Sequence, residues 1–137
     1  MATILGVVLN VHSLLRWVIA IVALVAVVRF GYGWLTKQSF QKLDRGLMSG
    51  LAGMVDTQLL VGIILLVGLG FSSRERWEHA FTMVLVAVLG HLPLRWKNAS
   101  DTNKFRNNFI TVVVMTLLVI AGVWTIRPGL GIWTQLF

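Results

Sequence analysis

The sequence predicts an all-α fold, an integral membrane four-helix bundle with up-down-up-down topology. Its 137 residues are 57% hydrophobic and only 12% charged, with a mean hydropathy of +0.82, which is not the composition of a soluble domain. Four apolar runs, each long enough to cross a bilayer, alternate with short polar segments. No repeat, low-complexity tract or linker interrupts the pattern, so residues 1–137 are expected to form a single four-span transmembrane domain.

Charge and composition exclude several classes of protein. The net charge of +7 comes from Lys and Arg in short loops, a distribution typical of membrane topology and not of a nucleic-acid-binding face. The chain has no cysteine, which excludes disulfides, iron–sulfur clusters and thiolate-ligated haem. No nucleophile–base pair, phosphate loop or metal-ligand cluster is visible, so no independent enzymatic activity is expected.

The first span is placed at about residues 5–30, ahead of Trp34, an aromatic residue suited to the membrane interface. It lacks the basic start and cleavage site of a signal peptide and is therefore expected to be retained. The second span is placed at about residues 46–71, the third at 74–94 and the fourth at 109–126.

One face of the second span carries small residues, which suit close packing against another helix, and a carboxylate near mid-membrane. These residues are Gly46, Ser49, Gly50, Gly53, Asp56, Thr57 and Leu60. Gln58 lies about 200° round the helix from Asp56 and is expected to face a different neighbour.

The ends of the third and fourth spans carry recognisable signals. Ser72 and Glu75 match a capping box, which predicts a helix start with Ser72 at the cap. Pro93 has no backbone N–H and is expected to bend or end that helix. After the fourth span, residues 129–137 form a short apolar tail that is expected to lie in the membrane interface.

The Lys and Arg residues predict the orientation. Eight of them lie in or beside the loops after the first and third spans: Arg29, Lys37, Lys42, Arg45, Arg95, Lys97, Lys104 and Arg106. The other side has only Arg74, Arg76 and Arg127. Since cytoplasmic loops carry the excess of Lys and Arg, those two loops are expected inside and both termini outside the cytoplasm.

Two ionisable residues within the first span indicate a functional site. His12 and Arg16 are four residues apart, so a helix places them on one face. Ionisable groups inside the membrane are costly and usually have a partner or a task. At 1.5 Å per residue, His12 and His79 are expected roughly 9 and 12 Å outside the bilayer centre, at nearly one level on diagonal helices.

Two neutral imidazoles facing each other across a bundle can be the axial ligands of a b-type haem. Arg16, one turn below His12, can then pair with a propionate or with a quinone oxygen. The alternative for each histidine is structural. His79 can be a solvated first-turn residue, and His12 can hydrogen-bond a neighbouring carbonyl and bind nothing.

Arg16 and Asp56 are expected to form a buried pair between the first and second helices, because an unpartnered ion in a low dielectric is costly. The pair can act as a structural clamp or serve proton or quinone chemistry. His91 lies about 120° round the helix from His79. It is interpreted as a structural histidine, with a second site or a subunit contact as alternatives.

The chain resembles a family of small bacterial four-span proteins labelled cytochrome b-like, whose function is unsettled. The resemblance rests on His12-Ser13-x-x-Arg16-Trp17, Lys42-x-Asp44-Arg45, Gln58-x-x-x-Gly62, Glu78-His79 and Arg127-Pro128. It implies a multi-pass protein of the bacterial inner membrane. Members carry a further His in the second span, where this chain has Asp56; if that His binds haem, this chain retains only His12 and His79.

Two classes of function follow. The first is a small accessory subunit of a larger respiratory or photosynthetic electron-transfer complex, with membrane lipid and other integral membrane subunits as its partners. Small size and an apolar tail favour this class. The alternative is an electron-transfer protein that binds haem b or quinone through His12, Arg16 and His79. A variant of both binds (bacterio)chlorophyll through His12 or His91.

Overall fold

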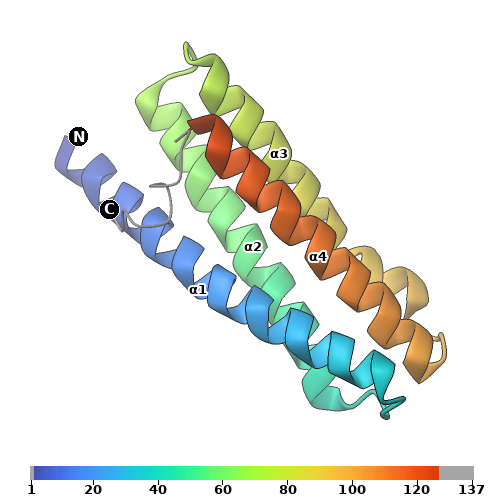
Figure 1. Cartoon of the computed structure of the whole chain (residues 1–137). Helices are drawn as coiled ribbons and strands as arrows, with labels where there is room; N and C mark the ends of the chain where they lie inside the picture. Colours follow the sequence, from blue (N-terminus) through green and yellow to red (C-terminus); the bar gives the residue numbers. More distant parts are fainter. Residues whose placement is uncertain (1, 127–137) are drawn as a thin grey trace.

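The computed structural model describes residues 2–126, which form four long helices (Figure 1). Their bounds are α1 Ala2–Leu35, α2 Lys42–Leu69, α3 Arg74–Gly90 and α4 Asp101–Ile126, with a short 3₁₀ helix η1, Leu92–Trp96, between α3 and α4. The described residues contain no strand, so the predicted all-α class is confirmed over this range.

Consecutive helices run antiparallel and pack side by side (Figure 1). α1 packs against α2 and α4, and α3 packs against the same two helices, so α1 and α3 lie diagonally across the bundle. This is the arrangement expected from short connections between neighbouring helices. In this arrangement α1 and α3 can contact each other only through the faces that point into the centre of the bundle.

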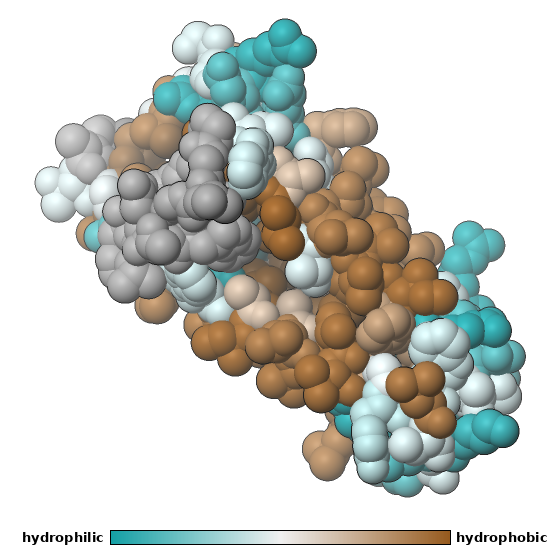
Figure 2. Space-filling model, viewed as in Figure 1, coloured by the Kyte–Doolittle hydropathy of each residue, from teal (hydrophilic) through white to brown (hydrophobic). Residues whose placement is uncertain are grey.

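All four helices are long and apolar enough to cross a membrane. Figure 2 shows a mostly apolar band over the middle of the visible face, with polar residues gathered at the two ends of the bundle. Large apolar side chains such as Ile21, Leu24, Ile64 and Leu117 are exposed within that band. Such an apolar exterior is compatible with contact with lipid tails, and the polar ends are compatible with contact with water.

An ion pair joins α1 to α2 at the cationic end of the bundle, which is the end with the α1–α2 and α3–α4 connections. Arg29 donates to both carboxylate oxygens of Asp44, through Nε at 2.6 Å and Nη2 at 3.0 Å. Asp44 is buried, and its Oδ2 also accepts the Gln41 backbone N–H at 2.8 Å, which caps α2. The two-pronged geometry fixes where α2 begins relative to α1.

Aromatic rings fill the space beside this pair. Phe30, Phe40 and Phe105 are in mutual contact, with Phe30 and Phe105 fully buried. Gly33 lets α4 come close to α1, since a methyl group at Gly33 would lie 2.5 Å from the Phe105 ring. This end of the bundle is therefore closed by packing.

The helices extend beyond the predicted spans at four of the eight ends, namely both ends of α1 and the starts of α2 and α4. α1 continues to Leu35 and α4 begins at Asp101, eight residues before the expected start of its span. Spans were predicted from apolar runs alone, whereas backbone hydrogen bonding continues through polar residues outside the apolar band. The expected tail at residues 129–137 lies outside the described residues.

Both ends of α3 differ in detail from the expectation. The N-cap is Ser73, not Ser72, and its hydroxyl donates to Glu75 Oε2 at 2.6 Å instead of to the backbone. The helix ends at Gly90, short of the predicted residue 94, and continues as the 3₁₀ helix that contains Pro93. Because proline has no N–H and clashes with the preceding turn, the α-helix ends before it.

Candidate cofactor-binding site

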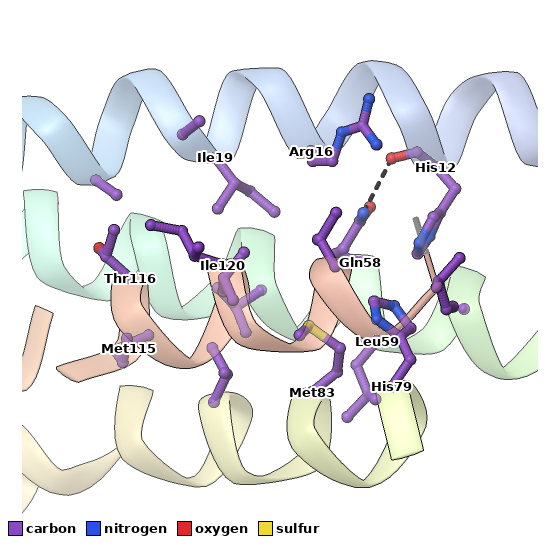
Figure 3. Close-up of a pocket in the computed structure, with 18 of the residues that line it drawn as sticks. His12, Arg16, Ile19, Gln58, Leu59, His79, Met83, Met115, Thr116 and Ile120 are labelled. Carbon is purple, nitrogen blue, oxygen red and sulfur yellow. Dashed lines mark hydrogen bonds between the residues drawn. The ribbon is translucent and has the colours of Figure 1, made fainter. Parts of the chain in front are cut away.

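The rings of His12 and His79 meet across the bundle in a T-shaped arrangement. Their centroids are 6.5 Å apart and their planes are inclined at 74°. One ring comes from α1 and the other from the diagonally opposed α3, so the structure brings together the two histidines that the sequence placed at one depth. Figure 3 shows both rings projecting into the same end of a cavity.

α4 holds the His79 ring. His79 Nδ1 lies 2.9 Å from the backbone carbonyl oxygen of Gly122, and with its proton on Nδ1 the ring donates to that oxygen. The second nitrogen, Nε2, then keeps its lone pair. Gly122 lets α4 approach α3 closely here, since a methyl group there would lie 2.5 Å from Met83 Cε and 3.1 Å from the Thr82 side chain.

α2 holds His12. Gln58 Nε2 donates to the His12 backbone carbonyl at 2.9 Å. The His12 ring lies over Gly62, where a methyl group would be only 3.3 Å from the ring carbon Cε1. Gln58 and Gly62 are one helical turn apart on α2, and both contact and position His12.

Two buried polar atoms beside this contact lack hydrogen-bond partners among residues 2–126, His12 Nδ1 and Gln58 Oε1. Buried polar groups are nearly always satisfied, so an unsatisfied pair beside a cavity indicates a group that a ligand completes. The described helices bury both atoms and supply neither of them with a hydrogen-bond partner.

The cavity has a volume of about 730 Å³ and is lined by all four helices. This volume lies within the range of small-molecule sites. Arg16 and Arg76 line it together with the two histidines and Gln58, and the rest of the lining is almost entirely aliphatic. The site therefore combines an apolar chamber with a few polar groups that lie within a turn or two of the histidines.

Asp56 was expected to be buried and paired with Arg16, and the structure differs from this prediction. The Asp56 carboxylate bonds His91 instead, with Oδ2 2.9 Å from Nε2, and it is 45% exposed. Asp56 lies at the edge of α2 that faces α3, while Arg16 lines the cavity on the other side of α2. His91 therefore has a structural partner and does not face the His12–His79 site.

Sequence reasoning missed the residues that position the histidines. Gln58 was expected to face a different neighbour from Asp56 and was otherwise noted, with Gly62, only as a motif of the resemblance; the carbonyl of Gly122 carries no sequence signal at all. The spacing of Gln58 and Gly62 was a usable signal, since residues four apart share a helix face. Arg76 was counted only as a loop cation, yet it also lines the cavity.

The two histidines do not amount to a protein-only metal site. No group of three or more His, Cys, Asp or Glu side chains able to hold a metal ion occurs within residues 2–126. A metal held between His12 and His79 would have to bring its remaining ligands with it. An iron porphyrin does this, since its ring supplies the four equatorial nitrogens.

Comparison with known proteins yields no relative for this chain. No family model, curated protein or solved structure matches it.

Proposed function

We propose that the chain is a multi-pass protein of a bacterial cell membrane that transfers electrons through a b-type haem held between His12 and His79. Both termini lie outside the cytoplasm in this proposal. The four apolar helices and the apolar band of Figure 2 support the membrane location. The observation that carries the redox function is the pair of imidazoles 6.5 Å apart.

The separation of the rings fits a shared metal. Two imidazoles that bind one ion from opposite sides have centroids about 6 Å apart, because each metal–nitrogen bond is about 2 Å and each nitrogen lies about 1 Å from its ring centre. The observed 6.5 Å is close to this value. The unsatisfied Nδ1 of His12 and the free Nε2 of His79 supply two nitrogen atoms for such an ion.

The surrounding residues fit the rest of a haem. The carbonyl of Gly122 orients His79, as a hydrogen-bonded carbonyl commonly does for a metal-binding histidine. Arg16 and Arg76 line the cavity and can pair with the two propionates of a haem, although Arg76 Nη1 already donates to the carbonyl oxygens of Leu69 and Gly70. The aliphatic lining excludes water and lowers the local dielectric, which tunes a redox potential. A bound haem supplies one-electron transfer.

A quinone is the second candidate for the same cavity, because Gln58 Oε1 is buried without a donor. The hydroxyl groups of a hydroquinone donate hydrogen bonds, and the aliphatic chamber suits a prenyl tail. The accessory-subunit role stands as the proposal from a different class. In that role the chain packs within a larger complex and contributes no redox centre.

The test is the haem content and reduced-minus-oxidised spectrum of the full chain purified from its native membrane. We expect the intensity of the haem bands per protein to fall by about tenfold or more in His12→Ala and in His79→Ala, since each substitution removes one axial ligand. His91→Ala is the matched control and should keep them. Bands that survive both single substitutions, or a wild type that carries quinone or no cofactor, would overturn the haem assignment.

A further inference from the structure

An ionisable pair lies exposed on the outside of the apolar part of the bundle. Asp56 is in the middle of α2, and its bond to His91 joins α2 to the end of α3. The two side chains are 45% and 54% exposed. Ionisable groups in membrane helices almost always face protein or a water-filled cavity, because lipid cannot solvate them. A lipid contact is therefore a poor explanation for this surface.

The α2 surface beside the pair is small and polar, and we call it the α2 face. It comprises Gly46, Ser49, Gly50, Gly53 and Thr57, all exposed, with Asp56 at its edge. A methyl group at Gly46, Gly50 or Gly53 would meet nothing within 4 Å in the chain. The outward faces of α1 and α4 carry large residues such as Ile21 and Val114 instead.

We propose that the α2 face packs against the same face of a second copy of this chain, related by a two-fold axis. The inference rests on the proposed membrane location and is independent of the cofactor. It places the contact between copies in the cationic half of the bundle, away from His12 and His79.

Charge and shape both favour a second copy as the occupant. Asp56 at the edge of the face and His91 beside it at the end of α3 present an acid and a base side by side, so this surface is complementary to itself when one copy is rotated onto another. Asp56 of one protomer can then pair with His91 of either. Glycines at successive turns let two backbones come close, which is how helices associate where no hydrophobic driving force acts between them.

The chain has no cysteine, so single cysteines can report on the contact. Gly53→Cys and Thr57→Cys should each form a disulfide-linked dimer on mild oxidation of the full chain in its native membrane. Ile21→Cys on α1 is the matched control. It lies at about the depth of Gly53, by counting along the antiparallel helices from the contact of His12 with Gly62.

Gly53→Leu tests the same contact without cysteine. The chain leaves open space at this position, so the protomer should fold normally and the dimer should weaken by about tenfold or more. Gly6→Leu is the control, because Gly6 is also exposed and also has open space around it. The haem spectrum of Gly53→Leu should equal that of the wild type, so the interface and the cofactor can fail separately.

The results that would overturn the proposal are specific. They are a wild type that is monomeric in its membrane, a dimer that persists in Gly53→Leu, equal cross-linking through Ile21→Cys, or cross-linking of the α2 face only to a different polypeptide. Dimers captured through Gly53→Cys and Thr57→Cys and lost in Gly53→Leu would support it.

Discussion

At the level of single residues, the His12–His79 pair depends on two positions that carry no side chain. Gly62 leaves room for the His12 ring, and Gly122 brings its carbonyl oxygen to His79. A larger residue at Gly62 would crowd the His12 ring directly, and one at Gly122 would crowd Met83 and Thr82 on α3, the helix that carries His79. Substitutions at these glycines can therefore change the geometry of the pair while both histidines remain present.

Gly62→Val should reduce cofactor occupancy by about tenfold or more while the bundle remains folded. The new Cβ would lie 3.3 Å from His12 Cε1, and the two added methyl groups would crowd the ring further. Overpacking of this kind costs about 1–3 kcal/mol. Haem content per protein measures the effect, with Gly6→Val as the control. Full occupancy in Gly62→Val would show that α2 does not position His12.

Breaking the ion pair at the cationic end should cost about 3 kcal/mol in Asp44→Ala, measured by unfolding in mixed detergent. The substitution leaves Arg29 partly buried without its carboxylate and removes the cap of α2. Glu78→Ala is the control. Its pair with Arg74 is exposed and should contribute less than about 1 kcal/mol. Equal losses in the two variants would contradict the structural role of Asp44.

The depth of a residue in the membrane could be predicted from the sequence, but the direction of its side chain could not. Counting 1.5 Å per residue along each helix was enough to put His12 and His79 at one level. It was not enough for Asp56, because pairing also depends on how each helix is rotated about its axis. Asp56 lies at the edge of α2 beside α3, and so it bonds His91 and not Arg16.

At the level of the helices, the close approach of α1 to α4 depends on Gly33. Gly33→Leu should destabilise the bundle by about 1–3 kcal/mol or more, since its Cβ would lie 2.5 Å from the buried Phe105 ring. Gly6→Leu should change the unfolding free energy little. If Gly33→Leu unfolds like the wild type, α1 and α4 are not packed at this point as described.

Hydropathy predicted the number and order of the helices but not their ends. Apolar runs stop at the edge of the band in Figure 2, while α1 and α4 continue with polar residues beyond it. The spacing of Ser72 and Glu75 predicted Ser72 as the cap, whereas in the structure Ser73 is the cap and its hydroxyl bonds Glu75. Neither detail could be obtained from residue patterns.

At the level of the whole molecule, the cationic end predicts the orientation in the membrane. A reporter inserted at Ser100 should appear in the cytoplasm, and one fused after residue 137 should appear outside it, because cytoplasmic loops carry the excess of Lys and Arg. The reverse pair of results would place His12 and His79 on the cytoplasmic side of the membrane.

The central claim is that His12 and His79 share one haem iron, and electron paramagnetic resonance of the oxidised protein tests it most directly. Two imidazole ligands make the iron low-spin, and planes inclined at 74°, near perpendicular, produce a strongly anisotropic signal with a large principal g value. We expect that signal in the wild type and in His91→Ala, and its loss in His12→Ala and His79→Ala. A high-spin signal, or a low-spin signal that persists without either histidine, would contradict the account.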